Sequence, residues 1–195
     1  NFAETTATFT IADTTPPAAS ANNFTVQLDA NGNASITTAN INNASSDICG
    51  SVTLSLDVTA FDCSDVGANP VVLTVTDDCG NSSTASATVT VQDLLSPTIT
   101  APADVSVSAD SGICTASSVA LGNATAADNC SYTVTNDAPA NFPLGNTTVT
   151  WTVTDASGNT ATDTQVVTVT DDEKPAIANT PANITQNVDA GLCTA

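Results

Sequence analysis

Apolar and polar residues alternate along several stretches of the chain. Threonines fill most of the intervening positions in three of these stretches, whose apolar positions are Val71, Leu73 and Val75; Ala87, Val89 and Val91; and Val149, Trp151 and Val153. Because successive side chains of a strand point to opposite faces, this pattern predicts β-strands with one face in a core and the other in water. Trp151 is therefore expected in the core rather than on a sugar-stacking surface.

Turn motifs separate the predicted strands, and no window shows a helical 3.6-residue stripe. The motifs are DANGN at 29–33, DDCGN at 77–81, FPLGN at 142–146 and DASGN at 155–159. Short strands at regular spacing predict an all-β fold of immunoglobulin-like β-sandwich domains. A small barrel or a β-solenoid is the alternative, although solenoid repeats are usually shorter, about 20–45 residues. DANGN also resembles the start of an EF-hand loop, but its glycine stands at position four, so an Asn-Gly hairpin turn is preferred.

The chain repeats itself with a period close to 80 residues. Asp13, Asp93 and Asp171 are each followed four residues later by proline, SSDIC at 45–49 matches AADNC at 126–130, and DSGICTA at 110–116 recurs as DAGLCTA at 189–195. Such a period indicates a tandem array, which we expect to form a rod. The predicted parts are the last strand of a preceding repeat at 1–13, full repeats at 14–93 and 94–172, and the first part of a following repeat at 173–195.

The charge and composition of the chain exclude several classes of function. It has 20 acidic residues, a single basic residue, Lys174, and a net charge of −19. Such a surface repels nucleic acid and anionic lipid, so we expect no nucleic-acid partner. The sequence has no run of 18 apolar residues, so we expect no membrane insertion. No histidine is present for a Ser-His-Asp triad, and no P-loop or GxGxxG pattern occurs, so no enzyme activity is expected.

Six cysteines without a CxxC motif or any histidine favour disulfides over a zinc site. Disulfides in turn indicate an oxidising, extracellular compartment. Counting back from the matched Cys49 and Cys130 places Cys114 of the second repeat opposite Asn33 of the first. The counting predicts the disulfides Cys49–Cys63 and Cys114–Cys130.

Two cysteines are left over by this pairing. Cys193 matches Cys114, and its partner is expected outside this segment. Cys79 is expected to be unpaired, although Cys63 and Cys79 can also compete for Cys49. A catalytic role for Cys79 is not expected, because no basic group is at hand to lower its pKa.

The quoted motifs resemble a known family. FPLGNTTVTWTVTDASGNTATDTQVVTVTDDEKP at 142–175 is similar to hyalin-repeat (HYR) domains, and the first repeat looks like related repeats of giant surface adhesins of Bacteroidetes. The resemblance includes SprB-like gliding-motility adhesins exported by the type IX system. It implies immunoglobulin-like domains stacked in tandem and a role in adhesion or as a stalk. In one departure, Asp163 stands where HYR repeats often carry a further cysteine near the last strand.

Carboxylates gather at the predicted junctions between repeats. Calcium takes six to eight oxygen ligands, and carboxylates at a domain junction can supply them. The candidate calcium ligands are Asp13, Asp93, Asp171, Asp172 and Glu173 at the junctions, and Asp77 and Asp155 at nearby turns. The alternative is that these are solvated residues that end strands and begin turns.

The sequence therefore predicts a structural or adhesive segment of a long extracellular adhesin or filament. We expect it at the outer-membrane surface of a bacterium, where it serves cell-surface attachment or gliding. Neighbouring repeats would be its immediate partners, and surface polysaccharide or other cells would be met by a distal region. The alternatives are a carbohydrate- or protein-binding module and a self-polymerising filament subunit. The binding module is less favoured, because only seven aromatic residues are present.

Overall fold

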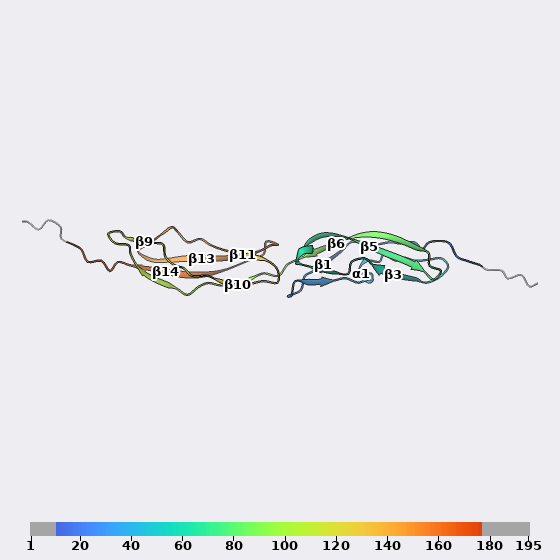
Figure 1. Cartoon of the computed structure of the whole chain (residues 1–195), viewed down its shortest axis with the longest axis horizontal. Helices are drawn as coiled ribbons and strands as arrows, with labels where there is room; N and C mark the ends of the chain where they lie inside the picture. Colours follow the sequence, from blue (N-terminus) through green and yellow to red (C-terminus); the bar gives the residue numbers. More distant parts are fainter. Residues whose placement is uncertain (1–10, 177–195) are drawn as a thin grey trace, which may run out of the picture. The chain divides into compact units, whose positions relative to one another are not determined.

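The computed structural model of the protein describes residues 11–176 (Figure 1). Two compact units are distinguished, and each is considered by itself. Unit 1 contains the described residues up to 103 together with 122–138 and 149–165, and unit 2 contains 104–121, 139–148 and the described residues from 166. Most of the predicted strand at 1–13, and Cys193 with most of the segment 173–195, lie outside the described residues.

The first repeat is built on one four-stranded sheet with the order β1-β6-β5-β3. β1 runs parallel to β6, whereas β5 is antiparallel to both β6 and β3. A second layer consists of the antiparallel pair β2 and β4 and of isolated bridges. The elements are β1 (Phe24–Gln27), β2 (Asn33–Ser35), α1 (Thr38–Ile41), β3 (Val52–Leu56), β4 (Ala60–Asp62), the 3-10 turn η1 (Cys63–Asp65), β5 (Gly67–Asp77) and β6 (Ser82–Gln92).

The second repeat has the same strand order. Its four-stranded sheet runs β8-β14-β13-β11, with β8 again parallel to β14. β9 pairs with β12 as β2 pairs with β4 in the first repeat, and β7 pairs with β10. The strands are β7 (Thr98–Thr100), β8 (Val105–Ser108), β9 (Thr115–Ser117), β10 (Thr125–Ala127), β11 (Tyr132–Asn136), β12 (Asn141–Pro143), β13 (Gly145–Asp155) and β14 (Thr160–Thr170).

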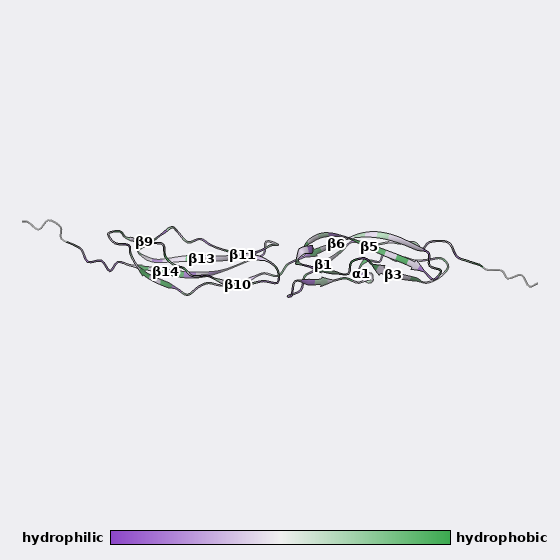
Figure 2. Cartoon of the chain, viewed as in Figure 1, coloured by the Kyte–Doolittle hydropathy of each residue, from purple (hydrophilic) through white to green (hydrophobic). Residues whose placement is uncertain are grey.

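The core consists of the residues that the alternation selects. All nine apolar residues of the three alternating stretches are buried, six of them with 0% exposure. In Figure 2, which colours the ribbon by the hydropathy of each residue, green segments alternate with paler or purple ones along β5 and β14. The all-β, immunoglobulin-like sandwich predicted from the sequence is thus confirmed, and Trp151 is a core residue.

The two cores differ in their chemistry at one position on each of the two long strands. In the second repeat the Trp151 Nε1–H donates to Gln165 Oε1 at 3.2 Å, and Gln165 Nε2 donates to the Ala103 carbonyl at 2.7 Å. The first repeat places Leu73 and Ala87 at the same positions of β5 and β6. A buried amide that satisfies two polar groups thus replaces a purely apolar pair.

The DANGN segment is a turn, although not a hairpin between paired strands. Asp29 Oδ1 accepts hydrogen bonds from the backbone N–H groups of Asn31 and Asn33, and Gly32 has a φ of 74°. β1 before the turn pairs with β6, whereas β2 after it pairs with β4. The turn therefore moves the chain from one layer of the sandwich to the other.

Within the described residues, no helix has the length and apolar character needed to cross a membrane.

Candidate calcium site and inter-repeat disulfide

Three carboxylates of unit 1 come together from distant parts of the sequence. Asp93 follows β6, Asp128 lies just before β11, and Asp155 is the last residue of β13. One ligand oxygen from each lies within 4.8 Å of the others. Asp93 is 4% exposed and Asp155 5% exposed, so two of the three carboxylates are withdrawn from water.

Local hydrogen bonds hold these side chains in place. The Asp155 carboxylate accepts hydrogen bonds from the backbone N–H groups of Ser157 and Asn159 and from the Asn159 amide. The same Asn159 amide donates to the Asp93 carbonyl at 3.2 Å and so ties the turn after β13 to the end of β6. Asp128 Oδ2 accepts from the Cys130 N–H at 2.9 Å.

Three buried oxygens at this place have no hydrogen-bond partner among the described residues. They are Asp93 Oδ2, Asp128 Oδ1 and Asn129 Oδ1. Leaving a buried polar atom unpaired costs about 1–3 kcal/mol, and more when the group is charged. Like charges at this separation add repulsion. A bound cation would remove both costs.

The protonation state of Asp155 suits a cation site. Burial raises the pKa of Asp155, but the hydrogen bonds from the Asn159 side chain and from nearby backbone N–H groups lower it more, so its pKa lies below the ordinary value. The group is therefore a carboxylate at neutral pH. Its oxygens can accept hydrogen bonds from the turn and bind a metal ion at the same time.

The donor set fits calcium better than softer or smaller metals. Carboxylate and amide oxygens are the ligands of a hard cation, and Ca–O distances of about 2.3–2.6 Å place opposite ligands roughly 5 Å apart. The three oxygens lie within 4.8 Å of one another, so a single ion can reach all of them. Asp93, Asp128 and Asp155 with Asn129 Oδ1 would hold the ion, and water would complete its shell.

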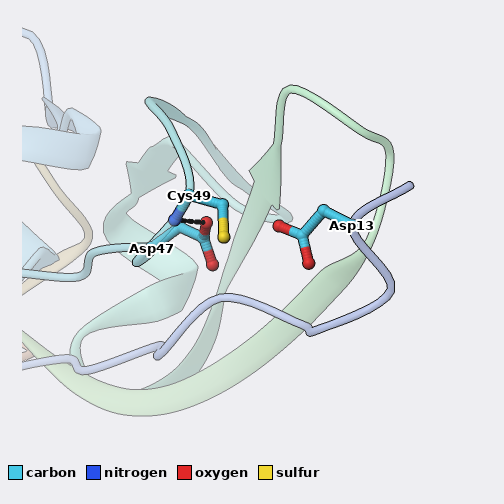
Figure 3. A group of neighbouring side chains, drawn as sticks. All are labelled: Asp13, Asp47 and Cys49. Atoms are coloured by element: carbon cyan, nitrogen blue, oxygen red, sulfur yellow. Dashed lines mark hydrogen bonds between the residues drawn. The ribbon is translucent and has the colours of Figure 1, made fainter. Parts of the chain in front are cut away.

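A related group lies at the start of the first repeat (Figure 3). Asp13, Asp47 and Cys49 bring their ligand atoms within 4.8 Å of one another, and the Cys49 N–H donates to Asp47 Oδ2 at 2.7 Å. The negative charge of Asp13 raises the pKa of the Cys49 thiol. A protonated thiol is a poor ligand for calcium, so this group has two suitable ligands, against three in the group of Asp93, Asp128 and Asp155.

The structure thus unites two of the predicted calcium ligands, Asp93 and Asp155, with Asp128. Sequence reasoning did not single out Asp128, although the AADNC landmark contained it. The equivalent landmark residue Asp47 lies beside Asp13.

The other predicted calcium ligands are engaged elsewhere. Asp77 repeats the turn role of Asp155 by accepting hydrogen bonds from Cys79 and Asn81. Asp171 accepts from the Glu173 N–H. Asp172 accepts from the Ser108 hydroxyl, and Glu173 accepts from Ser111 and Gly112.

The disulfide pairing predicted from the sequence is wrong. Cys63 is bonded to Cys130, with an S–S distance of 1.99 Å and a sequence separation of 67 residues. This excludes both Cys49–Cys63 and Cys114–Cys130, and Cys49 and Cys114 are free and exposed. Cys79 is also free among the described residues. The bond joins the first repeat to the second rather than closing a loop inside each.

The counting failed at one turn. The Asp29 N–H donates to the Asn33 carbonyl, whereas the Asp110 N–H donates to the Thr115 carbonyl. Asn33 thus corresponds to Thr115, and Cys114 is an additional residue in a longer turn. This turn lies at the opposite end of its strands from Cys130, which precedes β11, so the two sulfurs of the second repeat do not meet.

The Asp163 departure also has a structural explanation. Its Oδ2 accepts a hydrogen bond from the Ala101 N–H at 2.7 Å, and Oδ1 accepts from the Thr164 N–H. These backbone hydrogen bonds lower the pKa of Asp163 below its usual range. A charged hydrogen bond therefore fastens the last strand to the segment before β8, at the position where the resemblance leads one to expect a cysteine.

One part of the chain matches a known domain family. Residues 92–169 match the HYR domain family, which supports a hyalin-repeat, immunoglobulin-like assignment for the second repeat. HYR domains are adhesion-type extracellular modules and are generally not enzymes. No curated protein sequence is similar enough to the chain to count as a match.

Solved structures similar to this chain include several cadherins. Drosophila N-cadherin EC1–4 aligns with 80% of this chain and 50% of its own at 14% identity and a TM-score of 0.44. Human protocadherin-24 EC1–2 aligns with 82% of this chain and 100% of its own at 11% identity and a TM-score of 0.42. The chain thus spans half the length of the N-cadherin fragment.

Proposed function

We propose that this chain is a segment of a long extracellular surface adhesin in which tandem immunoglobulin-like repeats form a stalk. The observation that carries the proposal is the Cys63–Cys130 disulfide between two consecutive repeats of one topology. A covalent link between successive repeats suits a part that carries tension, and disulfides persist in oxidising compartments. The sequence resemblance extends the proposal to bacterial surface adhesins of the gliding type.

Resistance to proteolysis is consistent with this role. One lysine and no arginine leave trypsin-like proteases almost no cleavage site. The net charge of −19 keeps neighbouring stalks apart and attracts cations from the medium. A polysaccharide-binding role is less well supported, because Trp151, the only tryptophan, is 6% exposed.

Surface labelling tests the proposed location. An antibody raised against the folded protein is expected to label intact cells of the source organism, and external proteinase K should remove the label. An antibody against a cytoplasmic protein is the control for cell integrity. Labelling that requires permeabilised cells would overturn the extracellular assignment.

We further propose that calcium binds Asp93, Asp128 and Asp155 and stiffens the junction between the repeats. Extracellular modules bind calcium with dissociation constants of about 10⁻⁴–10⁻³ M. Calcium at 100 times the dissociation constant would stabilise the folded state by about 2.7 kcal/mol. The predicted rod-like stacking of the repeats belongs to this proposal and is tested by small-angle scattering with calcium and with chelator.

Thermal unfolding of the full chain in 10 mM calcium and in chelator tests the site. Calcium should raise the Tm of the natural chain, and D93N and D128N should abolish most of the increase because each removes a ligand charge. D137N is the matched control, since Asp137 is an exposed aspartate that accepts a backbone hydrogen bond outside the group. An equal increase in D128N and D137N would exclude this site.

A further inference from the structure

The observed disulfide places a sulfur beside one particular turn of the first repeat. A Cβ added to Gly32 would lie 2.7 Å from Cys63 Sγ and 2.7 Å from the Asn129 carbonyl oxygen. The turn at 29–33 is therefore closely covered by the disulfide and by the residue before Cys130. Cys63 reaches this place from η1, immediately after β4.

The second repeat also has a cysteine at this turn, but the cysteine lies in the turn itself rather than after the equivalent of β4. The Gly32 N–H donates to the Asp29 carbonyl in the first repeat, and the Ile113 N–H donates to the Asp110 carbonyl in the second. Cys114 follows Ile113 directly. Leu144 stands after β12, where Cys63 stands after β4 in the first repeat. Each repeat thus has one cysteine at this turn.

The position of Cys130, the second cysteine of the disulfide, also recurs in both repeats. The Cys130 N–H donates to Asp128 Oδ2 at 2.9 Å, and the Cys49 N–H donates to Asp47 Oδ2 at 2.7 Å. Both cysteines stand shortly before the equivalent strands β3 and β11. An Asp-x-Cys segment therefore presents a sulfur at the opposite end of each repeat.

Among the described residues of unit 2, little covers Cys114. Cys114 is exposed and Ile113 is 55% exposed, whereas the matching turn of the first repeat is covered. The Glu173 carboxylate holds the turn through the Ser111 hydroxyl at 2.6 Å and the Gly112 N–H at 2.7 Å. A hollow beside it is lined by Gly112, Ile113, Cys114, Asp171, Glu173 and Lys174, with Pro175 and Ala176.

We propose that Cys114 forms a disulfide with the Asp-x-Cys cysteine of a following repeat of the same kind. Cys63–Cys130 would then be one member of a series in which each repeat is bonded to the next. The inference rests on the proposed function, which supplies tandem repeats in an oxidising compartment. The two thiols lose two protons and two electrons to a disulfide oxidant, which is reduced to two thiols, and one S–S bond forms.

The test uses the full chain with residues 94–172 duplicated directly after Asp172, ahead of 173–195. The protein is folded with oxidised and reduced glutathione, alkylated without reduction, digested with pepsin and mapped by mass spectrometry. We expect a peptide pair linking Cys114 to the cysteine of the duplicated segment that corresponds to Cys130. Cys63–Cys130 serves as the internal positive control.

A matched variant separates this bond from non-specific oxidation. C114S in the extended chain should leave the duplicate's copy of Cys130 open to alkylation, because that cysteine has lost its partner. The Cys63–Cys130 bond should stay intact. Alkylation of Cys114 while Cys63–Cys130 is protected would overturn the proposal, and so would a Cys114–Cys130 bond or an unbonded Cys63. Alkylated Cys114 beside an intact Cys63–Cys130 bond leaves the surface labelling and the calcium shift unchanged, so this inference can fail while the proposed function stands. Loss of the Cys63–Cys130 bond would count against both.

Discussion

Single residues decide how closely the two repeats can be joined. Gly32 has a φ of 74° and no room for a Cβ, because Cys63 Sγ and the Asn129 oxygen occupy that space. Gly112 in the second repeat has a φ of 76° and nothing within 4 Å of its Cβ position. The two glycines share a left-handed φ, and only Gly32 is covered by neighbouring atoms.

This difference makes a matched pair of substitutions. Both G32A and G112A place an alanine in the left-handed region, which costs about 1–2 kcal/mol. G32A should cost about 1–3 kcal/mol more, because the added methyl group overpacks the disulfide. Urea unfolding measures both, and alkylation should detect Cys63 and Cys130 in G32A but not in G112A. Equal losses of stability would show that the covered turn does not exist in solution.

At the scale of the elements, the two repeats use one sheet order with different core chemistry. The long strands β5 and β6 place Leu73 and Ala87 in the core, whereas β13 and β14 place Trp151 and Gln165 there. Gln165 is fully buried and links Trp151 to the carbonyl of Ala103. The amide thereby fastens the two long strands to the segment before β8.

Replacing this amide tests its role in the second repeat. Q165L keeps the approximate volume but leaves the Ala103 carbonyl and the Trp151 Nε1–H without these partners. At about 1–3 kcal/mol for each unpaired buried group, we expect a loss of about 2–4 kcal/mol in the free energy of unfolding. Q92L is the control, because Gln92 is exposed at the end of β6. A loss no larger than that of Q92L would contradict the buried hydrogen bonds.

At the scale of the whole molecule, the connection between repeats combines a covalent bond and hydrogen bonds with the carboxylates proposed to bind calcium. Asn129 lies between Asp128 of the carboxylate group and Cys130 of the disulfide. Its amide donates to the Asp29 carbonyl at 3.2 Å and to Asp93 Oδ1 at 3.3 Å. The disulfide therefore holds the same short segment that supplies proposed calcium ligands, and the two should support each other.

Removing the disulfide tests this coupling. In the chain-entropy relation, a cross-link across 67 residues stabilises by about 4 kcal/mol, so C63S should lower the free energy of unfolding by about that amount. C63S should also show a smaller calcium-induced increase in Tm, because the ligands are less well preorganised. C79S is the control, since Cys79 is free and exposed. An undiminished calcium shift in C63S would show that the two links are independent.

The sequence by itself determined the all-β class, which face of each long strand is buried, and that Trp151 lies in the core. These follow from a two-residue period that is local, so each segment carries its own signal. The sequence also included Asp93, which precedes a proline-bearing linker, and Asp155, which lies in a turn, among its candidate calcium ligands.

Only the tertiary structure decided which residues meet. One extra residue in the turn before Thr115 changed the alignment of Cys114, and the pairing of Cys63 with Cys130 depends on contacts between segments 67 residues apart. The approach of Asp128 to Asp93 and Asp155 likewise depends on contacts between segments that are far apart in the sequence. Alternation reports which face of a strand is buried, but it carries no information on which turns of successive repeats come into contact.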